Sequence, residues 1–351
     1  MASPREEEGE DEVPDGMVSS FFSSQSDLST IPAVVDARAA EDRVARYRLK
    51  NNDDRTKQVL SSFLQFLQAE GRQVLADFIA NTVDDRVLFS LYKHLLTSIL
   101  VPMKARSATP TVTPSPFDDN DDAVKQIAAS MDESPSRKSQ AQLEKLCLHR
   151  DNFRCMVTGI VDVDSKGMRA SLAGISGPTQ LSHILPLSIG RWDNNKQDHA
   201  VSQVWATLTK CFPRIELGPS DINHPTNLMT LYDTVHSAFG KFTLAFEPTS
   251  SSPFDESNEY KVLTFGRKYP TVLDIHLPQP NAHGDRIVKF EKYADVDLPS
   301  PVLLQIHAAL ANILHASGTA EYIDKVMEER EEIQCLASNG STNIQRLLFA
   351  F

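Results

Sequence analysis

Two histidines and an asparagine, His183, Asn227 and His236, have side chains of the types that could support hydrolysis of a phosphodiester bond. This reaction needs a base that activates water, a cation that neutralises the charge growing on the phosphate, and groups that hold both in line. An imidazole titrates near neutrality, so one histidine could take the proton of water while the other ligates a metal ion. The asparagine amide could fix either a backbone segment or an imidazole.

The residues around these three side chains follow a wider pattern. The first histidine lies in Ser182-His183-Ile184-Leu185-Pro186, and Asn227 precedes His236 by nine positions. The other supporting positions are Arg154, Thr158, Gly159, Leu228 and Leu231. Over roughly residues 144–250, this arrangement resembles the HNH endonuclease domain in the form carried by many fungal proteins.

The resemblance implies a ββα-metal fold, a nucleic-acid substrate and a divalent metal, which could be Mg²⁺, Mn²⁺, Ni²⁺ or Zn²⁺. By position in the motif, His183 would be the general base, Asn227 the orienting residue and His236 a metal ligand. Asn227 also has a simpler interpretation, because it follows Pro225-Thr226 and could cap the next helix.

The second metal ligand departs from the family pattern. Many relatives carry Asp or His immediately before the base, whereas this chain has Ser182, and a hydroxyl is a poor ligand for a hard divalent ion. Asp233 lies one helical turn before His236 and could supply a carboxylate directly or through water. We therefore expect His236 and Asp233 as the metal ligands.

A structural zinc ion is not expected. Many relatives use two Cys-x-x-Cys pairs, but here the first pair reads Cys155-x-x-Thr158 and the second reads Tyr232-x-x-Val235. One cysteine of four cannot hold such an ion, so we expect apolar packing in its place, with Cys155 buried as a small hydrophobe.

Two arginines could contact the substrate phosphates. Arg150 and Arg154 lie just upstream of the motif, although pairing of an arginine with Asp151 or with a helix end is the commoner outcome. The remaining histidines considered have no motif around them and are expected to be core or surface groups: His94, His199, His224, His276, His283, His307 and His315.

Charge and cysteine content limit the ligands and the cellular compartments that we expect for the protein. The formal net charge is −12, and residues 1–16 carry seven acidic residues against one basic residue. Residues 144–247 contain ten Lys and Arg and ten Asp and Glu, and this neutrality counts against tight nonspecific DNA binding. With four irregularly spaced cysteines, no signal peptide and no apolar stretch near the roughly 20 residues of a membrane span, we expect an intracellular protein, nuclear or cytoplasmic, neither secreted nor membrane-bound.

Hydropathy and composition, together with the ββα fold that the HNH resemblance implies, predict an α+β protein. Apolar residues recur at helical spacing within 59–67, 74–79 and 88–99, whereas 105–140 is rich in Pro, Ser and Asp. We predict five regions: a disordered acidic tail (1–30), a helical N-terminal region (31–104), a linker (105–140), an HNH nuclease-like domain with an inserted helix (141–260), and C-terminal strands and helices that pack on it (261–351).

The leading functional hypothesis is a metal-dependent endonuclease that acts on DNA or another nucleic acid. The alternative is a catalytically inactive HNH scaffold that binds nucleic acid, or a protein partner through its helical N-terminal or C-terminal regions. Ser182, the absent zinc cysteines and the neutral charge of the domain favour this alternative. A third class, a metal-independent interaction protein, would be indicated if His183 and His236 point apart.

Overall fold

The N-terminal helices form where apolar residues recur at helical spacing. The computed structural model describes residues 37–104, 112–117, 120–131, 137–168, 171–192, 195–250, 257–266 and 269–334, so the predicted tail at 1–30 lies outside the described residues. The first helices are α1 (Ala37–Arg46), α2 (Thr56–Phe66), α3 (Ala69–Asn81) and α4 (Asp85–Leu95). Their apolar stripes, including Leu60, Ile79 and Leu91, are buried, which confirms the helical periodicity.

A proline explains the π-helical turn that follows α4. Helix α4 passes into the π-helical turn η1 (Leu96–Leu100) and then into α5 (Val101–Lys104). Because Pro102 has no N–H and its ring would clash with the carbonyl four residues earlier, the helix widens to a π turn just before it. The widened turn leads to Met103, whose side chain is buried.

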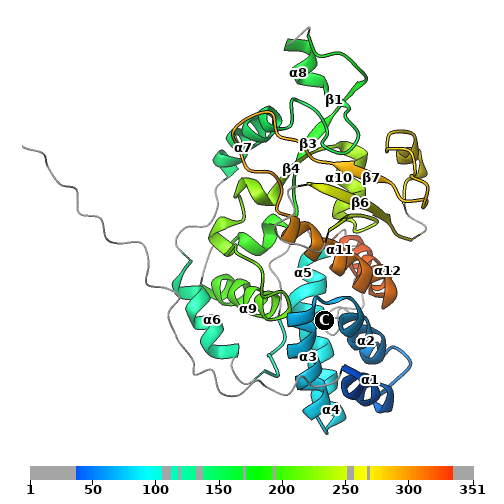
Figure 1. The fold of residues 1–351 in the computed structure, drawn as a ribbon. Helices are drawn as coiled ribbons and strands as arrows, with labels where there is room; N and C mark the ends of the chain where they lie inside the picture. Colours follow the sequence, from blue (N-terminus) through cyan, green and yellow to red (C-terminus); the bar gives the residue numbers. More distant parts are fainter. Residues whose placement is uncertain are drawn as a thin grey trace, which may run out of the picture. The chain divides into compact units, whose positions relative to one another are not determined.

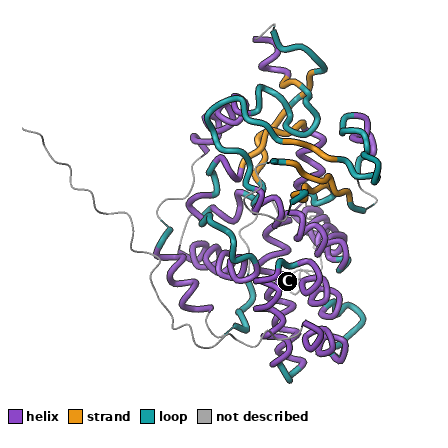
Figure 2. Tube along the Cα trace, in the orientation of Figure 1, coloured by secondary structure: helices purple, strands orange, loops and turns teal. Residues whose placement is uncertain are grey.

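The strands form three small sheets among the described residues. β3 (Thr179–His183) and β4 (Leu228–Tyr232) pair antiparallel, with Thr179 opposite Tyr232 and His183 opposite Leu228. β1 (Val161–Asp162) pairs with β2 (Ser176–Gly177), and β5 (Leu244–Pro248), β6 (Glu259–Thr264) and β7 (Ile287–Lys289) form an antiparallel sheet in that order. Figure 2 shows these strands gathered in one part of the described chain, apart from helices α1–α4.

The remaining helices pack around the strands. They are α7 (Arg137–Arg150), α8 (Val163–Met168), α9 (Asn195–Cys211), α10 (Asp233–Gly240), α11 (Pro301–Ala316) and α12 (Thr319–Gln334), with short turns η2 (Leu187–Gly190), η3 (Pro219–Asp221), η4 (Pro225–Asn227) and η5 (Thr271–Ile275). Helix α11 contacts both β5 and α2, so it joins the strands to the N-terminal helices (Figure 1). The predicted α+β class is confirmed.

The segment 105–140 contains more structure than its composition predicts. Its described part includes α6 (Asn120–Ala129), which packs on α9, and Phe117, which is buried beside Phe78. The carbonyl of Thr113 accepts a hydrogen bond from the buried imidazole of His94. A few large apolar and polar groups therefore hold this segment on the helices despite the prolines around them.

None of the helices in the described part of the chain combines the length and the apolar character that a membrane crossing requires.

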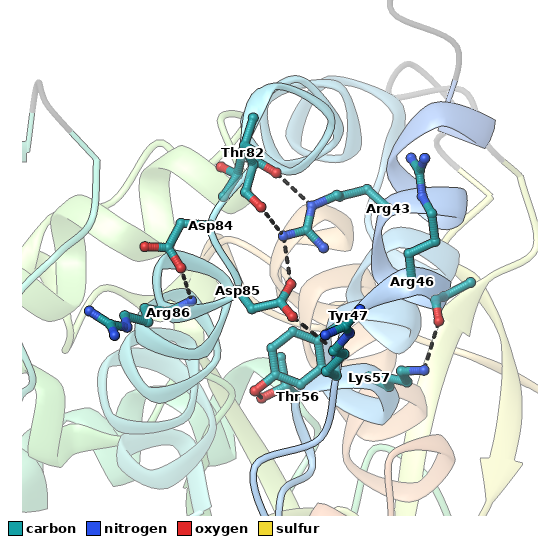
Figure 3. A network of polar contacts seen from close by, with 12 residues as sticks. Arg43, Arg46, Tyr47, Thr56, Lys57, Thr82, Asp84, Asp85 and Arg86 are labelled. Carbon is teal, nitrogen blue, oxygen red and sulfur yellow. Dashed lines mark hydrogen bonds and ion pairs between the residues drawn. The ribbon is translucent and has the colours of Figure 1, made fainter.

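A buried arginine fixes the geometry of the first helices (Figure 3). Arg43 on α1 donates to the carbonyls of Thr82 and Val83, at 2.6 and 2.9 Å, and pairs with the Asp85 carboxylate at 2.8 Å. These bonds satisfy carbonyls that follow the end of α3 and tie α1 to the start of α4.

Asp54 forms a second polar centre between α1 and α2. Its carboxylate accepts hydrogen bonds from the Tyr47 hydroxyl, the Lys50 amide, and both the amide and the hydroxyl of Thr56. Burial alone would raise the pKa of Asp54, but these four bonds outweigh it and hold the pKa below its ordinary value.

We expect Asp54→Asn to lower the free energy of unfolding by about 1–3 kcal/mol near neutral pH, because the amide cannot accept all four bonds. Since the pKa is depressed in the folded state, this stabilisation is fully present above the unfolded-state pKa of about 3.9 and is lost as the pH falls through the folded-state value. Urea unfolding near neutral pH and at about pH 3 measures both effects.

The exposed neighbour Asp53 gives a matched control, since Asp53→Asn removes the same charge without a buried contact. Equal stability of the Asp54→Asn and Asp53→Asn variants at neutral pH would contradict this account.

Candidate functional site

The β3–β4 hairpin and helix α10 bring the motif histidines together (Figure 1). His183 is the last residue of β3, and α10 starts at Asp233, directly after β4 ends. The amide of Asp233 donates to the carbonyl of Pro178, which holds the start of the helix against the start of β3. His236 therefore lies one turn into a helix that packs on both strands.

His183 and His236 line one cavity of about 170 Å³. A third imidazole, His307 of α11, and the buried Ser182 also line it, whereas most of the remaining wall is apolar and includes Met103 of α5. Both motif histidines border the same cavity, which does not favour the third hypothesis, a metal-independent interaction protein.

The imidazole of His183 is held by Asn223. The His183 Nε2 atom lies 2.9 Å from the Asn223 Oδ1 atom. Because an amide oxygen can only accept, Nε2–H donates and Nδ1 keeps the lone pair of the neutral ring. Burial lowers the pKa of His183, the bond to Asn223 opposes this shift, and the positive charge of Arg191 lowers the pKa further. A neutral ring at physiological pH can accept a proton at Nδ1.

Asn227 acts on the backbone rather than on an imidazole. Its buried Oδ1 accepts from the Leu185 amide at 2.8 Å, and its Nδ2 donates to the carbonyls of Leu185 and Ile222 at 3.0 and 2.8 Å. Its own carbonyl accepts from the Ile184 amide. Asn227 thus fixes the chain just after His183 and just before Asn223, so it positions both members of that pair.

The two expected metal ligands, His236 and Asp233, do not lie in the same place. His236 lines the cavity, but Asp233 is exposed, accepts a hydrogen bond from Gln180 at 2.6 Å, and is not among the lining residues. Within the described ranges, no three His, Cys, Asp or Glu side chains gather closely enough to hold a metal ion. The cavity offers imidazoles and one hydroxyl without a carboxylate, so these side chains alone do not fit a hard divalent ion.

Arg150 is buried instead of facing the substrate. Its side chain is fully inaccessible, forms two hydrogen bonds with the Asp151 carboxylate, the shorter 2.6 Å, and donates to the carbonyls of Pro225, Leu228 and Asp297. The expected phosphate contact is therefore replaced by a structural role, because every side of the guanidinium is occupied by protein acceptors.

Arg154 is partly exposed and holds two loop carbonyls. It donates to the carbonyls of Gly159 and Ala173, at 3.0 and 2.8 Å. Gly159 has a φ of 70°, in the left-handed region that favours glycine, and its amide donates to the carbonyl of Cys155. Arg154 therefore braces the turn that begins the motif.

Cys155 is 1% exposed and packs in the apolar core, with its Sγ atom accepting from the Thr158 amide at 3.4 Å. The thiol thus lies among apolar side chains, as expected for a small hydrophobe.

Two residues of the site have no motif of their own in the sequence. Asn223 lies in a polar turn between η3 and η4, and only its position four residues before Asn227 distinguishes it from other loop asparagines. His307 was expected to be a core or surface histidine. It is buried, but its ring stacks between Phe239 and Phe242, with centroid distances of 3.8 and 4.3 Å, and borders the cavity.

We expect Asn227→Ala to lower the free energy of unfolding by about 2–4 kcal/mol, because it leaves the amide and carbonyl of Leu185 and the carbonyl of Ile222 without their side-chain partner. Asn223→Ala removes one bond at a half-buried position and serves as the control in the same denaturant titration. Equal loss of stability in both variants would refute the backbone role of Asn227.

The pKa of His183 is expected to lie below the ordinary histidine value and to fall further in Asn223→Ala, because that variant loses the hydrogen bond that favours the protonated ring. Titration of the imidazole carbon-bound protons by NMR measures both values. An unchanged or higher pKa in the variant would contradict the assigned contact.

Comparison with known proteins identifies a family model that matches the segment containing this site. Residues 155–247 match the family model described as HNH endonuclease, a segment that includes β3, β4 and α10. No curated protein and no solved structure matches the chain. The match confirms that the chain contains the predicted HNH domain, which implies nucleic-acid binding or cleavage of the nuclease type.

Proposed function

We propose that the HNH domain hydrolyses phosphodiester bonds of nucleic acid, with His183 as the general base. The observation that carries this proposal is that His183 and His236, from the hairpin and from α10, line one cavity. Asn227 and Asn223 hold the base through the backbone and through Nε2 respectively, so both are positioning residues.

The chemistry follows from the free lone pair of His183. Nδ1 accepts a proton from a water molecule, and the water oxygen forms a bond to phosphorus as the bond from phosphorus to the leaving oxygen breaks. The leaving oxygen gains a proton from solvent. Burial keeps His183 neutral near pH 7, so the base is ready before the substrate arrives.

The divalent ion implied by the family would neutralise charge on the phosphate. The described donors do not fit a complete site for it, since His236 lines the cavity while the carboxylate of Asp233 is bonded to Gln180 outside the cavity lining. The proposed mechanism therefore contains no step on a metal ion, and cleavage is measured both with different divalent ions and with EDTA.

We expect His183→Ala to reduce cleavage by about 100-fold or more, the usual contribution of a general base. Plasmid and single-stranded DNA are incubated with the full chain in Mg²⁺, Mn²⁺, Ni²⁺, Zn²⁺ or EDTA. Stability should change by only about 1 kcal/mol, because His183 makes one side-chain hydrogen bond. His283→Ala, an exposed histidine outside the cavity, is the control. Equal cleavage by His183→Ala and by the unchanged chain would refute the assignment.

The second candidate is an HNH scaffold that binds nucleic acid without cleaving it. The absence of a carboxylate among the described residues that line the cavity favours this function. Binding of DNA by the folded chain without cleavage under any of the metal conditions would support the scaffold over the enzyme.

A further inference from the structure

Arg191 is fixed next to the loop that holds the proposed base. It directly follows η2, whose Ile189 carbonyl accepts from the buried Trp205 indole at 2.7 Å. Gly190 packs on the next loop so closely that a Cβ atom there would lie 2.5 Å from the Ile222 side chain. Because Ile222 precedes Asn223, the backbone of Arg191 is anchored beside the residue that binds the His183 ring.

The guanidinium of Arg191 lacks the protein partners that Arg43, Arg150 and Arg154 have within the described chain. It is half-buried, yet it forms no hydrogen bond or ion pair with any residue that the structure describes. Arg43, Arg150 and Arg154, by contrast, all donate to carbonyls or carboxylates. Partial burial of an uncompensated cation is unfavourable, and an anionic ligand would offset this cost.

The surroundings of His183 need such a cation. Phosphodiester hydrolysis places growing negative charge on the phosphate, and the cavity lining supplies imidazoles and a hydroxyl without a permanent positive charge. The close packing of Gly190 on Ile222 brings the backbone of Arg191 beside the Asn223 loop that holds the His183 ring, and the positive charge of Arg191 lowers the pKa of that ring. A guanidinium also presents paired N–H donors that match two phosphate oxygens.

We infer that Arg191 binds the substrate phosphate beside His183 and neutralises its charge. This inference rests on the proposed function, and it assigns the anion-binding role at this site to a residue outside the His-Asn-His pattern. Two N–H groups of Arg191 donate to phosphate oxygens while Nδ1 of His183 takes the proton from water.

The test uses binding rather than cleavage as its main readout. Fluorescently labelled single-stranded and duplex DNA are titrated with the full chain carrying His183→Ala, so that the substrate stays intact, across a range of salt concentrations. Arg191→Ala and Arg191→Lys are compared with Arg86→Ala, which removes an exposed arginine that makes no side-chain hydrogen bond within the described chain. Thermal unfolding checks that each variant is folded.

We expect Arg191→Ala to weaken binding by about 10-fold and to reduce the slope of log affinity against log salt by about one unit, as for loss of one phosphate contact. Arg191→Lys should keep the salt slope but bind more weakly than arginine, because it lacks the planar pair of donors. Arg86→Ala should bind within about twofold of its parent.

Equal affinity of the Arg191→Ala and Arg86→Ala variants would overturn the role of Arg191, even where His183→Ala abolishes cleavage. Conversely, cleavage that survives in His183→Ala would refute the proposed base, while selective loss of binding in Arg191→Ala would still support the phosphate contact. The two proposals therefore fail on different measurements.

Discussion

The buried carboxamide of Asn227 is the interaction on which the site depends. It satisfies backbone groups of two segments that lie 37 positions apart in the chain, at Leu185 and Ile222, and neither segment could leave those groups unpaired in an apolar interior without a large cost. One segment carries His183 and the other carries Asn223. A single amide therefore sets the distance at which the imidazole and its hydrogen-bond acceptor meet.

Elements outside the family match complete the cavity. Met103 comes from α5, which follows the π turn η1, and His307 comes from α11. The buried Lys104 ammonium pairs with Asp324 of α12 at 2.8 Å and donates to the carbonyl of Lys241 at the end of α10. The N-terminal and C-terminal helices thus form part of the wall of the cavity. The boundaries of the five predicted regions remain predictions.

Sequence pattern predicted those features that depend on local periodicity or on a motif. The helices within residues 59–99 follow from the helical spacing of apolar residues, and the structure has them at α2, α3 and α4. The family was also evident from residues around His183, Asn227 and His236, and residues 155–247 match it.

Features that depend on contacts between distant segments could not be predicted from local sequence patterns. Arg150 looks like a phosphate ligand beside the motif, but its burial depends on carbonyls of Pro225 and Asp297, distant in the chain. Helix α6 packs on α9, which lies far from it in the sequence. The ring of His307 stacks on Phe239 and Phe242, about 65 residues earlier in the chain. No local pattern encodes such encounters, because each needs the complete fold.

The burial of Arg150 with Asp151 also bears on the electrostatic field of this domain, because it removes one charge of each sign from the surface and leaves the remaining charges balanced. Both side chains are inaccessible to solvent, so this pair cancels inside the protein and contributes little field outside it. Residues 144–247 are balanced in charge while the whole chain carries a formal net charge of −12, so a polyanion gains no long-range attraction from either. Its capture should proceed no faster than the unsteered rate of roughly 10⁵–10⁶ M⁻¹s⁻¹. Discrimination among nucleic acids would then arise after encounter, in how long each one stays bound.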